Sequence, residues 1–234
     1  MTIQEANQKV QVWIDDGDEE AVLDLDDLTS AEGLTLPGNF KGTLFLNGLT
    51  NAVGLKLPET IEGNLYLDGL TSAEGLTLPT SVEDLYLDGL TSAVGLTLPT
   101  EVGYLRLNGL TSAVGLTLPT SVGGLYLDGL TSAVGLTLPE TIEGNFSLNG
   151  LTSAEGLKLP TSVWHLSLNG LTSAVGLKLP TRVTGSLHLD GLTSAECLTL
   201  PESVEEKEIY LVRLPESDKE ALRQRHPNLA DKIK

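Results

Sequence analysis

Residues 65–82 read LYLDGLTSAEGLTLPTSV, and close variants of this segment recur from about residue 23 to about residue 211. The proline that closes each copy fixes the register of the repeat. These prolines are Pro37, Pro58, Pro79, Pro99, Pro119, Pro139, Pro160, Pro180 and Pro201. Consecutive prolines lie 20 or 21 residues apart, so the chain holds nine copies of one unit. A fixed period of this length predicts a repeat solenoid, in which stacked coils bury a core that no single coil can form.

Each copy contains two short runs in which leucine alternates with another residue. In the quoted copy they are Leu65-x-Leu67 and Leu76-x-Leu78. Alternation with a period of two predicts extended chain with the leucines on one side. Asp-Gly or Asn-Gly follows the first run and Pro follows the second, which is turn chemistry. We therefore expect a mainly β solenoid, with a strand on at least one side of every coil and extended chain or a second strand on the other.

Glycine marks two further features of the repeat. The copies of 21 residues carry their extra residue just before the first run, beside Gly63, Gly144 or Gly185, which predicts a bulge. Another glycine opens the second run in eight copies, and Cys197 replaces it in the last one. If that position needs a positive φ, Cys197 is strained. We expect its thiol to be buried and inert.

The two ends of the chain differ from the repeat. Residues 3–15 have the apolar spacing of a helix that Gly17 would end. Residues 216–225 predict a second helix with Ser217 or Asp218 as its N-cap, followed by a break at Pro227. The expected domains are a helical cap over 1–22, the solenoid over 23–212 and a helical cap over 213–234. The apolar face of the first helix comprises Ile3, Ala6, Val10, Trp13 and Ile14.

The pattern V-x-x-L-x-L-x-x-L over residues 82–90 resembles the short leucine-rich repeats of bacteria. Leu90 stands where that family has Asn or Cys, so we expect Thr91 and Ser92 to supply the hydrogen bonds inside the turn. The segment 12–25 resembles the helical cap of type III secreted effector repeat domains. The resemblance implies a horseshoe that binds proteins without catalysis, and a bacterial origin.

The formal net charge of −18 argues against nucleic acid or an anionic membrane as a partner. It favours a basic protein or peptide, although an acidic surface also keeps a long array in solution. One cysteine excludes an internal disulfide, and no apolar stretch predicts a signal peptide or a membrane span. We expect a monomer that is cytoplasmic, or secreted without a cleaved signal peptide.

Comparison of the copies with one another separates structural positions from variable ones. The middle residue of the second run is almost always Thr or Lys, whereas the middle residue of the first run and the residue before that run vary widely. Tyr and Arg, which anchor many protein interfaces, gather at these variable positions. Aromatic residues on strands also stabilise sheets, so a purely structural role stays open. The candidate partner-binding residues are Phe45, Tyr66, Tyr86, Tyr104, Arg106, Tyr126, His165 and His188.

No pattern indicates catalysis, a cofactor or a metal. The Asp or Asn after each first run, such as Asp68 and Asp88, precedes Gly, where it is expected to cap the local turn rather than to bind Ca²⁺. His165 and His188 fall at different positions of the repeat. The sequence therefore predicts a non-enzymatic scaffold that binds a protein or peptide. The alternative is a structural spacer, or a designed consensus solenoid, with no specific ligand.

Overall fold

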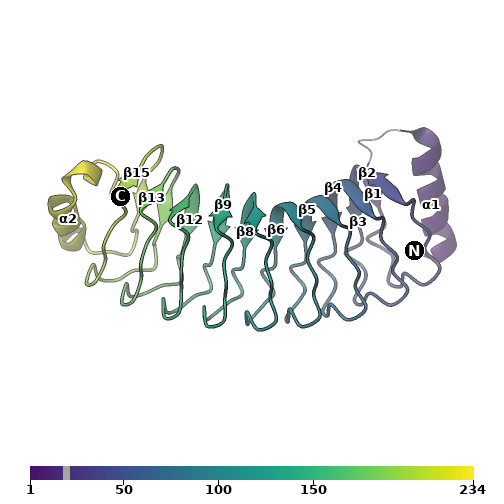
Figure 1. Cartoon of the computed structure of the whole chain (residues 1–234), viewed down its shortest axis with the longest axis horizontal. Helices are drawn as coiled ribbons and strands as arrows, with labels where there is room; N and C mark the ends of the chain where they lie inside the picture. Colours follow the sequence, from purple (N-terminus) through teal and green to yellow (C-terminus); the bar gives the residue numbers. More distant parts are fainter. Residues whose placement is uncertain (18–21) are drawn as a thin grey trace. The chain divides into compact units, whose positions relative to one another are not determined.

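The first apolar run of each coil forms a strand that pairs in parallel with the same run of neighbouring coils. The computed structural model of the protein describes residues 1–17 and 22–234. It shows a parallel β-solenoid of about nine coils with one helix near each terminus (Figure 1). The predicted fold class is confirmed. The coils form two compact units, Met1–Leu110 with Val114–Pro119, and Thr111–Ala113 with Thr120–Lys234.

In the N-terminal unit the sheet follows the order β1-β3-β4-β5-β6, and β2 also pairs with β4. Over the first runs the pairing places equivalent positions side by side, so that Leu65 lies beside Leu85 and Tyr66 beside Tyr86. The elements of this unit are α1 (Ile3–Asp16), β1 (Val22–Asp24), β2 (Asn39–Lys41), β3 (Thr43–Phe45), β4 (Thr60–Tyr66), β5 (Ser81–Tyr86) and β6 (Glu101–Arg106).

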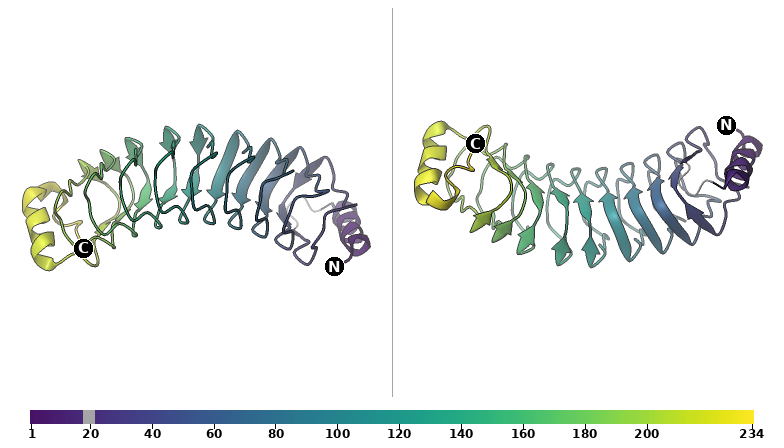
Figure 2. Two further views of the ribbon diagram at one scale, coloured as in Figure 1. Left: turned by 90° about the horizontal axis from the view of Figure 1, so that it is seen from below. Right: turned by 90° about the horizontal axis from the view of Figure 1, so that it is seen from above.

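In the C-terminal unit the main sheet follows the order β8-β10-β12-β14-β16, and two smaller sheets join β11-β13-β15 and β7-β9. In each unit, strands of successive coils lie side by side and point the same way (Figure 2). The elements are β7 (Ser121–Val122), β8 (Gly124–Tyr126), β9 (Thr141–Ile142), β10 (Asn145–Ser147), β11 (Ser162–Val163), β12 (His165–Ser167), β13 (Arg182–Val183), β14 (Leu187–His188), β15 (Ser203–Val204), β16 (Ile209–Tyr210), α2 (Glu216–Arg225) and the 3-10 turn η1 (Pro227–Leu229).

The core is a column of leucines inside the coils. Leu65, Leu67 and Leu70 are fully buried, and their equivalents in the other coils are buried in the same way. Each contributes about 1.5–3 kcal/mol through the removal of apolar surface from water. The second run, at Leu76 and Leu78, forms no strand, and its two leucines are half-buried. The possible second strand is therefore not formed by this run.

A ladder of Asp and Asn side chains links neighbouring coils. Asp68 Oδ1 accepts a hydrogen bond of 2.7 Å from the backbone N–H of Asp88, and Asp88 Oδ1 accepts one of 2.8 Å from Asn108. The same bond recurs in the C-terminal unit, where Asn149 Oδ1 accepts from the backbone N–H of Asn169 at 2.9 Å. The prediction of local turn capping was wrong, because these side chains reach the next coil. The expectation for Thr91 and Ser92 is confirmed for the serine, because Ser92 Oγ accepts a hydrogen bond of 3.3 Å from the backbone N–H of Val94 inside the turn. At the threonine position, Thr71 Oγ1 donates to the Thr50 carbonyl of the preceding coil at 3.3 Å.

Two glycine predictions are confirmed. The register shifts between Ile61 and Asn64, where Gly63 adopts a φ of 153° at the predicted bulge. The glycines that open the second run, from Gly33 to Gly176, all have positive φ, and Cys197 adopts a φ of 61° in their place. Cys197 is exposed, however, so the expectation of a buried thiol was wrong. At the equivalent turn of the preceding coil, a Cβ added to Gly176 would meet no atom within 4 Å.

Helix α1 packs against the first coil with Ala6 and Val10 buried. Thr2 and Glu5 form a capping box at its start, and Gly17 ends it with a left-handed conformation, as predicted. Ile14 is 45% exposed, so its assignment to the buried face was wrong. Residues 18–21, which include part of the effector-like segment, lie outside the described residues.

Helix α2 packs beside the last coil. It begins after Pro215 without a side-chain cap, so the predicted N-cap at Ser217 or Asp218 was wrong. Asp218 Oδ2 instead accepts a hydrogen bond of 2.9 Å from the backbone N–H of Ala195, which ties the helix to the last coil. Pro227 interrupts the helix and opens η1, as predicted. Within the described residues no helix is long and apolar enough to cross a bilayer.

Candidate partner-binding face

The middle residues of the first-run strands form one stack in the N-terminal unit. The parallel register places Phe45 beside Tyr66 and Tyr66 beside Tyr86. Their ring centroids are 4.3 Å and 4.0 Å apart, with the planes nearly parallel. Each ring is half-buried, because its flat face lies against its neighbour while its edge meets solvent. The repeat thus converts aromatic residues about 20 positions apart into one continuous surface, which we call the aromatic column (Phe45, Tyr66, Tyr86 and Arg106).

Arg106 ends this column. Its guanidinium carbon lies 5.6 Å from the ring centroid of Tyr86, within cation–π range. Asp88, a ladder residue, holds the guanidinium through an ion pair of 2.8 Å. Burial, followed by its hydrogen bond with Tyr66, raises the pKa of Tyr86, so the phenol stays neutral at physiological pH. The column therefore offers aromatic ring edges, the neutral hydroxyl of Tyr86 and one oriented cation.

Tyr104 is the residue just before its first run, two residues before Arg106 in the middle of that run. It lies opposite Asp84 in the register and its ring is 40% exposed. The backbone N–H of Tyr104 donates to Asp84 Oδ1 at 2.8 Å. Burial raises the pKa of the Asp84 carboxyl, although that hydrogen bond opposes the shift. Tyr104 thus stands beside the aromatic column on the same strand as Arg106.

The C-terminal unit presents a polar depression where the N-terminal unit has aromatic rings. Ser147 and Ser167 occupy the middle position of their strands, and their small side chains leave a depression of about 460 Å³. Tyr126 stands at its border and accepts a hydrogen bond of 3.0 Å from Asn145 Nδ2. The serines are bound into the ladder, since Ser147 Oγ donates to Asp128 and Ser167 Oγ donates to Asn149.

His165 and His188 line the same depression and meet at Ser186, which is almost fully buried. The Ser186 hydroxyl lies 2.8 Å from His165 Nδ1 and 2.9 Å from His188 Nε2. The backbone N–H of Ser186 also donates to His165 Nδ1 at 2.7 Å, so that nitrogen is unprotonated. Burial, followed by the charge of His188, lowers the pKa of His165. His188 in turn stacks on Tyr210 at 4.4 Å.

Ser186 was not among the predicted binding residues, although its spacing from His188 and Asp190 indicates a shared face. Ser186, His188 and Asp190 alternate along one chain segment, which places them on one side, and His188 Nδ1 lies 3.7 Å from Asp190 Oδ2. An acyl-transfer site would also need N–H donors for an oxyanion. Around Ser186 these donors are engaged: Gly185 donates to the Trp164 carbonyl and Leu187 to that of Glu208. The geometry therefore gives no support to a nucleophilic role for this serine.

The candidate residues thus fall into two groups, each within one unit. The aromatic column and Tyr104 lie in the N-terminal unit, and Tyr126, His165 and His188 surround the depression in the C-terminal unit. Among the described residues, no group of three or more His, Cys, Asp or Glu side chains is placed to hold a metal ion. Comparisons with known protein families, curated proteins and solved structures found no match to this chain.

Proposed function

We propose that this protein is a non-enzymatic scaffold that binds a protein or peptide through the variable positions of its first-run strands. The observation that carries the proposal is the aromatic column. Large side chains whose neighbours already hold them in place lose little conformational entropy when a partner docks. Tyr and Arg are also the residue types that contribute most at protein interfaces. The resemblance to leucine-rich repeats agrees with this role, and the Asp/Asn ladder supplies the inter-coil hydrogen bonds that such coils need.

The chemistry of the column suggests what a partner would present. Exposed ring edges and neutral hydroxyls suit apolar and hydrogen-bonding side chains, and Arg106 suits a carboxylate or a carbonyl oxygen. The surrounding protein carries a formal charge of −18, so the partner is expected to be basic overall. Such a partner would associate faster at low ionic strength, because charge attraction steers the encounter.

The test uses a peptide selected from a random displayed library on the intact protein. Tyr66→Ser with Tyr86→Ser removes two rings of the column and introduces a residue that the same position already holds at Ser147 and Ser167. The variant should bind the selected peptide at least about tenfold more weakly, as expected for the loss of interface anchors. Thr77→Ser with Thr97→Ser, in the second run, is the matched control and should leave the dissociation constant unchanged. Circular dichroism establishes that both variants are folded.

Two results would reject the proposal. Equal affinity of the wild type and the Tyr66→Ser, Tyr86→Ser variant would exclude the aromatic column as the binding face. Failure to select any peptide, together with no association between the protein and added basic proteins, would favour the alternative of a structural spacer. The near identity of the nine copies is the feature of the sequence that speaks for that alternative.

A further inference from the structure

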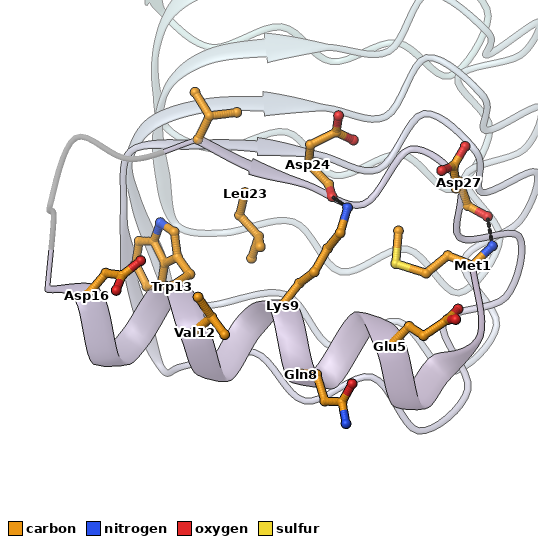
Figure 3. A pocket seen from close by; sticks show the side chains of 11 residues that line it. Met1, Glu5, Gln8, Lys9, Val12, Trp13, Asp16, Leu23, Asp24 and Asp27 are labelled. Carbon is orange, nitrogen blue, oxygen red and sulfur yellow. Dashed lines mark hydrogen bonds between the residues drawn. The ribbon is translucent and has the colours of Figure 1, made fainter.

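The N-terminal unit has an open groove between α1 and β1, with a volume of about 1000 Å³ (Figure 3). One wall is the side of α1 that carries Val12 and Trp13, and the other is the edge of β1 with Val22 and Asp24. β1 is the terminal strand of the sheet in this unit, so its outer edge has no further strand of the sheet beside it. The groove therefore runs along a sheet edge, which is a template for backbone pairing.

The direction of the backbone groups shows which residues would pair. Leu25 donates its N–H to Phe45 O at 3.0 Å and so faces β3. Because successive residues of a strand turn their backbone groups to opposite sides, Asp24 faces the groove, and Val22 does so as well. The Asp24 carbonyl confirms this direction, since it accepts a hydrogen bond of 3.0 Å from Lys9 Nζ on α1.

Cations rather than a strand meet the carbonyls along this edge. Besides Lys9 on Asp24, the amino group of Met1 donates to Asp27 O at 3.0 Å (Figure 3). The Lys9 ammonium sits on a flexible side chain, so a backbone N–H can displace it without loss of the hydrogen bond to the Asp24 carbonyl. A Lys side chain over an exposed edge also discourages unspecific pairing.

The outer edge of β16, the last strand of the C-terminal unit, is paired with backbone, unlike the edge of β1. Ile209 donates to Lys232 O at 2.9 Å, and Lys234 donates back to Ile209 O at 2.9 Å. Leu211 adds a bond of 3.1 Å to Lys234 O. The chain therefore closes the edge of β16 with the backbone of its own residues 232–234, whereas side-chain and terminal cations occupy the carbonyls at β1.

The apolar and charged residues that line the groove indicate what kind of segment it would bind. Val12 and Val22 are each 59% exposed and give both walls of the groove an apolar surface. Four carboxylates and two cationic groups line the groove, so its lining carries a formal charge of −2. The charged lining groups are Glu5, Asp16, Asp24, Asp27, Lys9 and the amino group of Met1. A second copy of this chain, with its charge of −18, is electrostatically disfavoured.

We propose that this groove binds an extended basic segment of a partner protein, which adds a strand to the edge of β1. The segment exchanges backbone hydrogen bonds with Val22 and Asp24 and displaces the Lys9 ammonium. Its apolar side chains rest on Val12 and Val22, and its basic side chains face the carboxylates. Backbone pairing supplies affinity, and the alternate side chains supply selectivity, as in other cases of strand addition. This site is separate from the aromatic column.

The experiment uses a labelled peptide of alternating lysine and valine that begins and ends with lysine. Fluorescence anisotropy measures its binding to the intact protein, and amide hydrogen exchange followed by NMR reports on Val22 and Asp24. The control peptide has the same side chains and charge, but its alternate backbone nitrogens are methylated so that it cannot pair. We expect the unmodified peptide to bind at least about tenfold more tightly and to protect the Val22 and Asp24 amides.

One variant of the protein is expected to bind the peptide more tightly than the wild type. Lys9→Ala frees the Asp24 carbonyl and removes a positive charge, so it should strengthen binding of the unmodified peptide by several-fold and leave the methylated peptide less affected. Equal binding of the two peptides, or protection elsewhere without protection of Val22 and Asp24, would overturn strand addition at β1. Concentration-dependent dimerisation that excludes the peptide, seen by sedimentation equilibrium, would overturn the assignment of a basic segment as the occupant.

Discussion

Asp68 accepts the backbone N–H of Asp88 at 2.7 Å, one coil further along the chain, and this bond belongs to the ladder that ties the coils together. Burial raises the pKa of Asp68, and the neighbouring Asp88 carboxylate acts in the same direction, while the hydrogen bond opposes both. The acceptor oxygen therefore stabilises the stack, but the negative charge on it does not. The amide oxygens of Asn47 and Asn149, which accept the same bond without a charge, agree with this separation of roles.

Asp68→Asn and Asp68→Ala separate the acceptor from the charge. Asp68→Asn keeps the acceptor and should leave the free energy of unfolding unchanged or raised. Asp68→Ala should lower it by about 1–3 kcal/mol, because the N–H of Asp88 loses its partner. A raised pKa means that the charged form is disfavoured in the fold, so the wild type loses stability as the pH rises from 3.8 through that pKa. Urea denaturation of both variants checks this, and an Asp68→Asn variant as unstable as Asp68→Ala would contradict it.

Cys197→Gly should stabilise the last coil. Cys197 holds a φ of 61°, a conformation that costs a residue with a side chain roughly 1–2 kcal/mol and glycine almost nothing. Part of this gain is offset by the greater freedom of glycine in the unfolded chain, so about 0.5–1 kcal/mol should remain. The reciprocal control is Gly135→Ala, where φ is 81° and an added Cβ meets nothing within 4 Å. Thermal unfolding should show the two substitutions acting in opposite directions.

Leu85→Ala tests the leucine column. Leu85 is fully buried between equivalent leucines of the adjacent coils, so truncation should lower the free energy of unfolding by about 2–5 kcal/mol. Val94→Ala in the same coil removes a side chain that is 65% exposed and should change stability by no more than about 0.5 kcal/mol. Chemical denaturation measures both changes. Comparable losses in the two variants would contradict a core filled by the first-run leucines.

His165 should make the C-terminal unit sensitive to acid. Its pKa is lowered from the ordinary value of 6.5 by burial and by His188, so the fold favours the neutral ring. Its contribution to stability is therefore complete above pH 6.5 and is lost as the pH falls from there through the lowered pKa. Protonation of Nδ1 would also remove the acceptor for the Ser186 N–H.

The variant His165→Asn introduces a residue that the same repeat position holds at Asn64 and Asn145. Urea denaturation between about pH 8 and pH 5 should show a smaller loss of stability for the variant than for the wild type. If the free energy of unfolding depended on pH identically in the two proteins, His165 would not be the cause of the acid sensitivity.

The sequence predicted those features that depend on one coil and its period. Leucine alternation marked the strands, and the glycines marked the positive φ values and the bulge at Gly63. These are local consequences of side-chain spacing and backbone sterics. The stacking of Phe45, Tyr66 and Tyr86 also followed, because a constant register places equal positions of successive coils side by side.

The remaining features depend on distances between coils, which the sequence does not contain. Asp68 preceded a glycine and was interpreted as a local cap, although its oxygen lies within reach of the next coil. Ser186 meets two histidines from adjacent coils, and Asp218 bonds to Ala195 instead of capping its own helix. Even the exposure of Cys197 depends on the direction in which an outer turn points. In each case the sequence predicted the strand, turn or helix that carries the residue. It did not predict which group the polar side chain bonds to, or whether the side chain is exposed.

Site-specific photo-crosslinking distinguishes partner docking on the aromatic column from docking on the second-run side of the coils. A photoreactive phenylalanine analogue would replace Tyr66 or Tyr86 in one set of proteins and Thr77 or Thr97 in another. With the selected peptide bound at saturation, we predict crosslinks from positions 66 and 86 and none from positions 77 and 97. Crosslinks only from 77 and 97, with none from 66 and 86, would contradict the account.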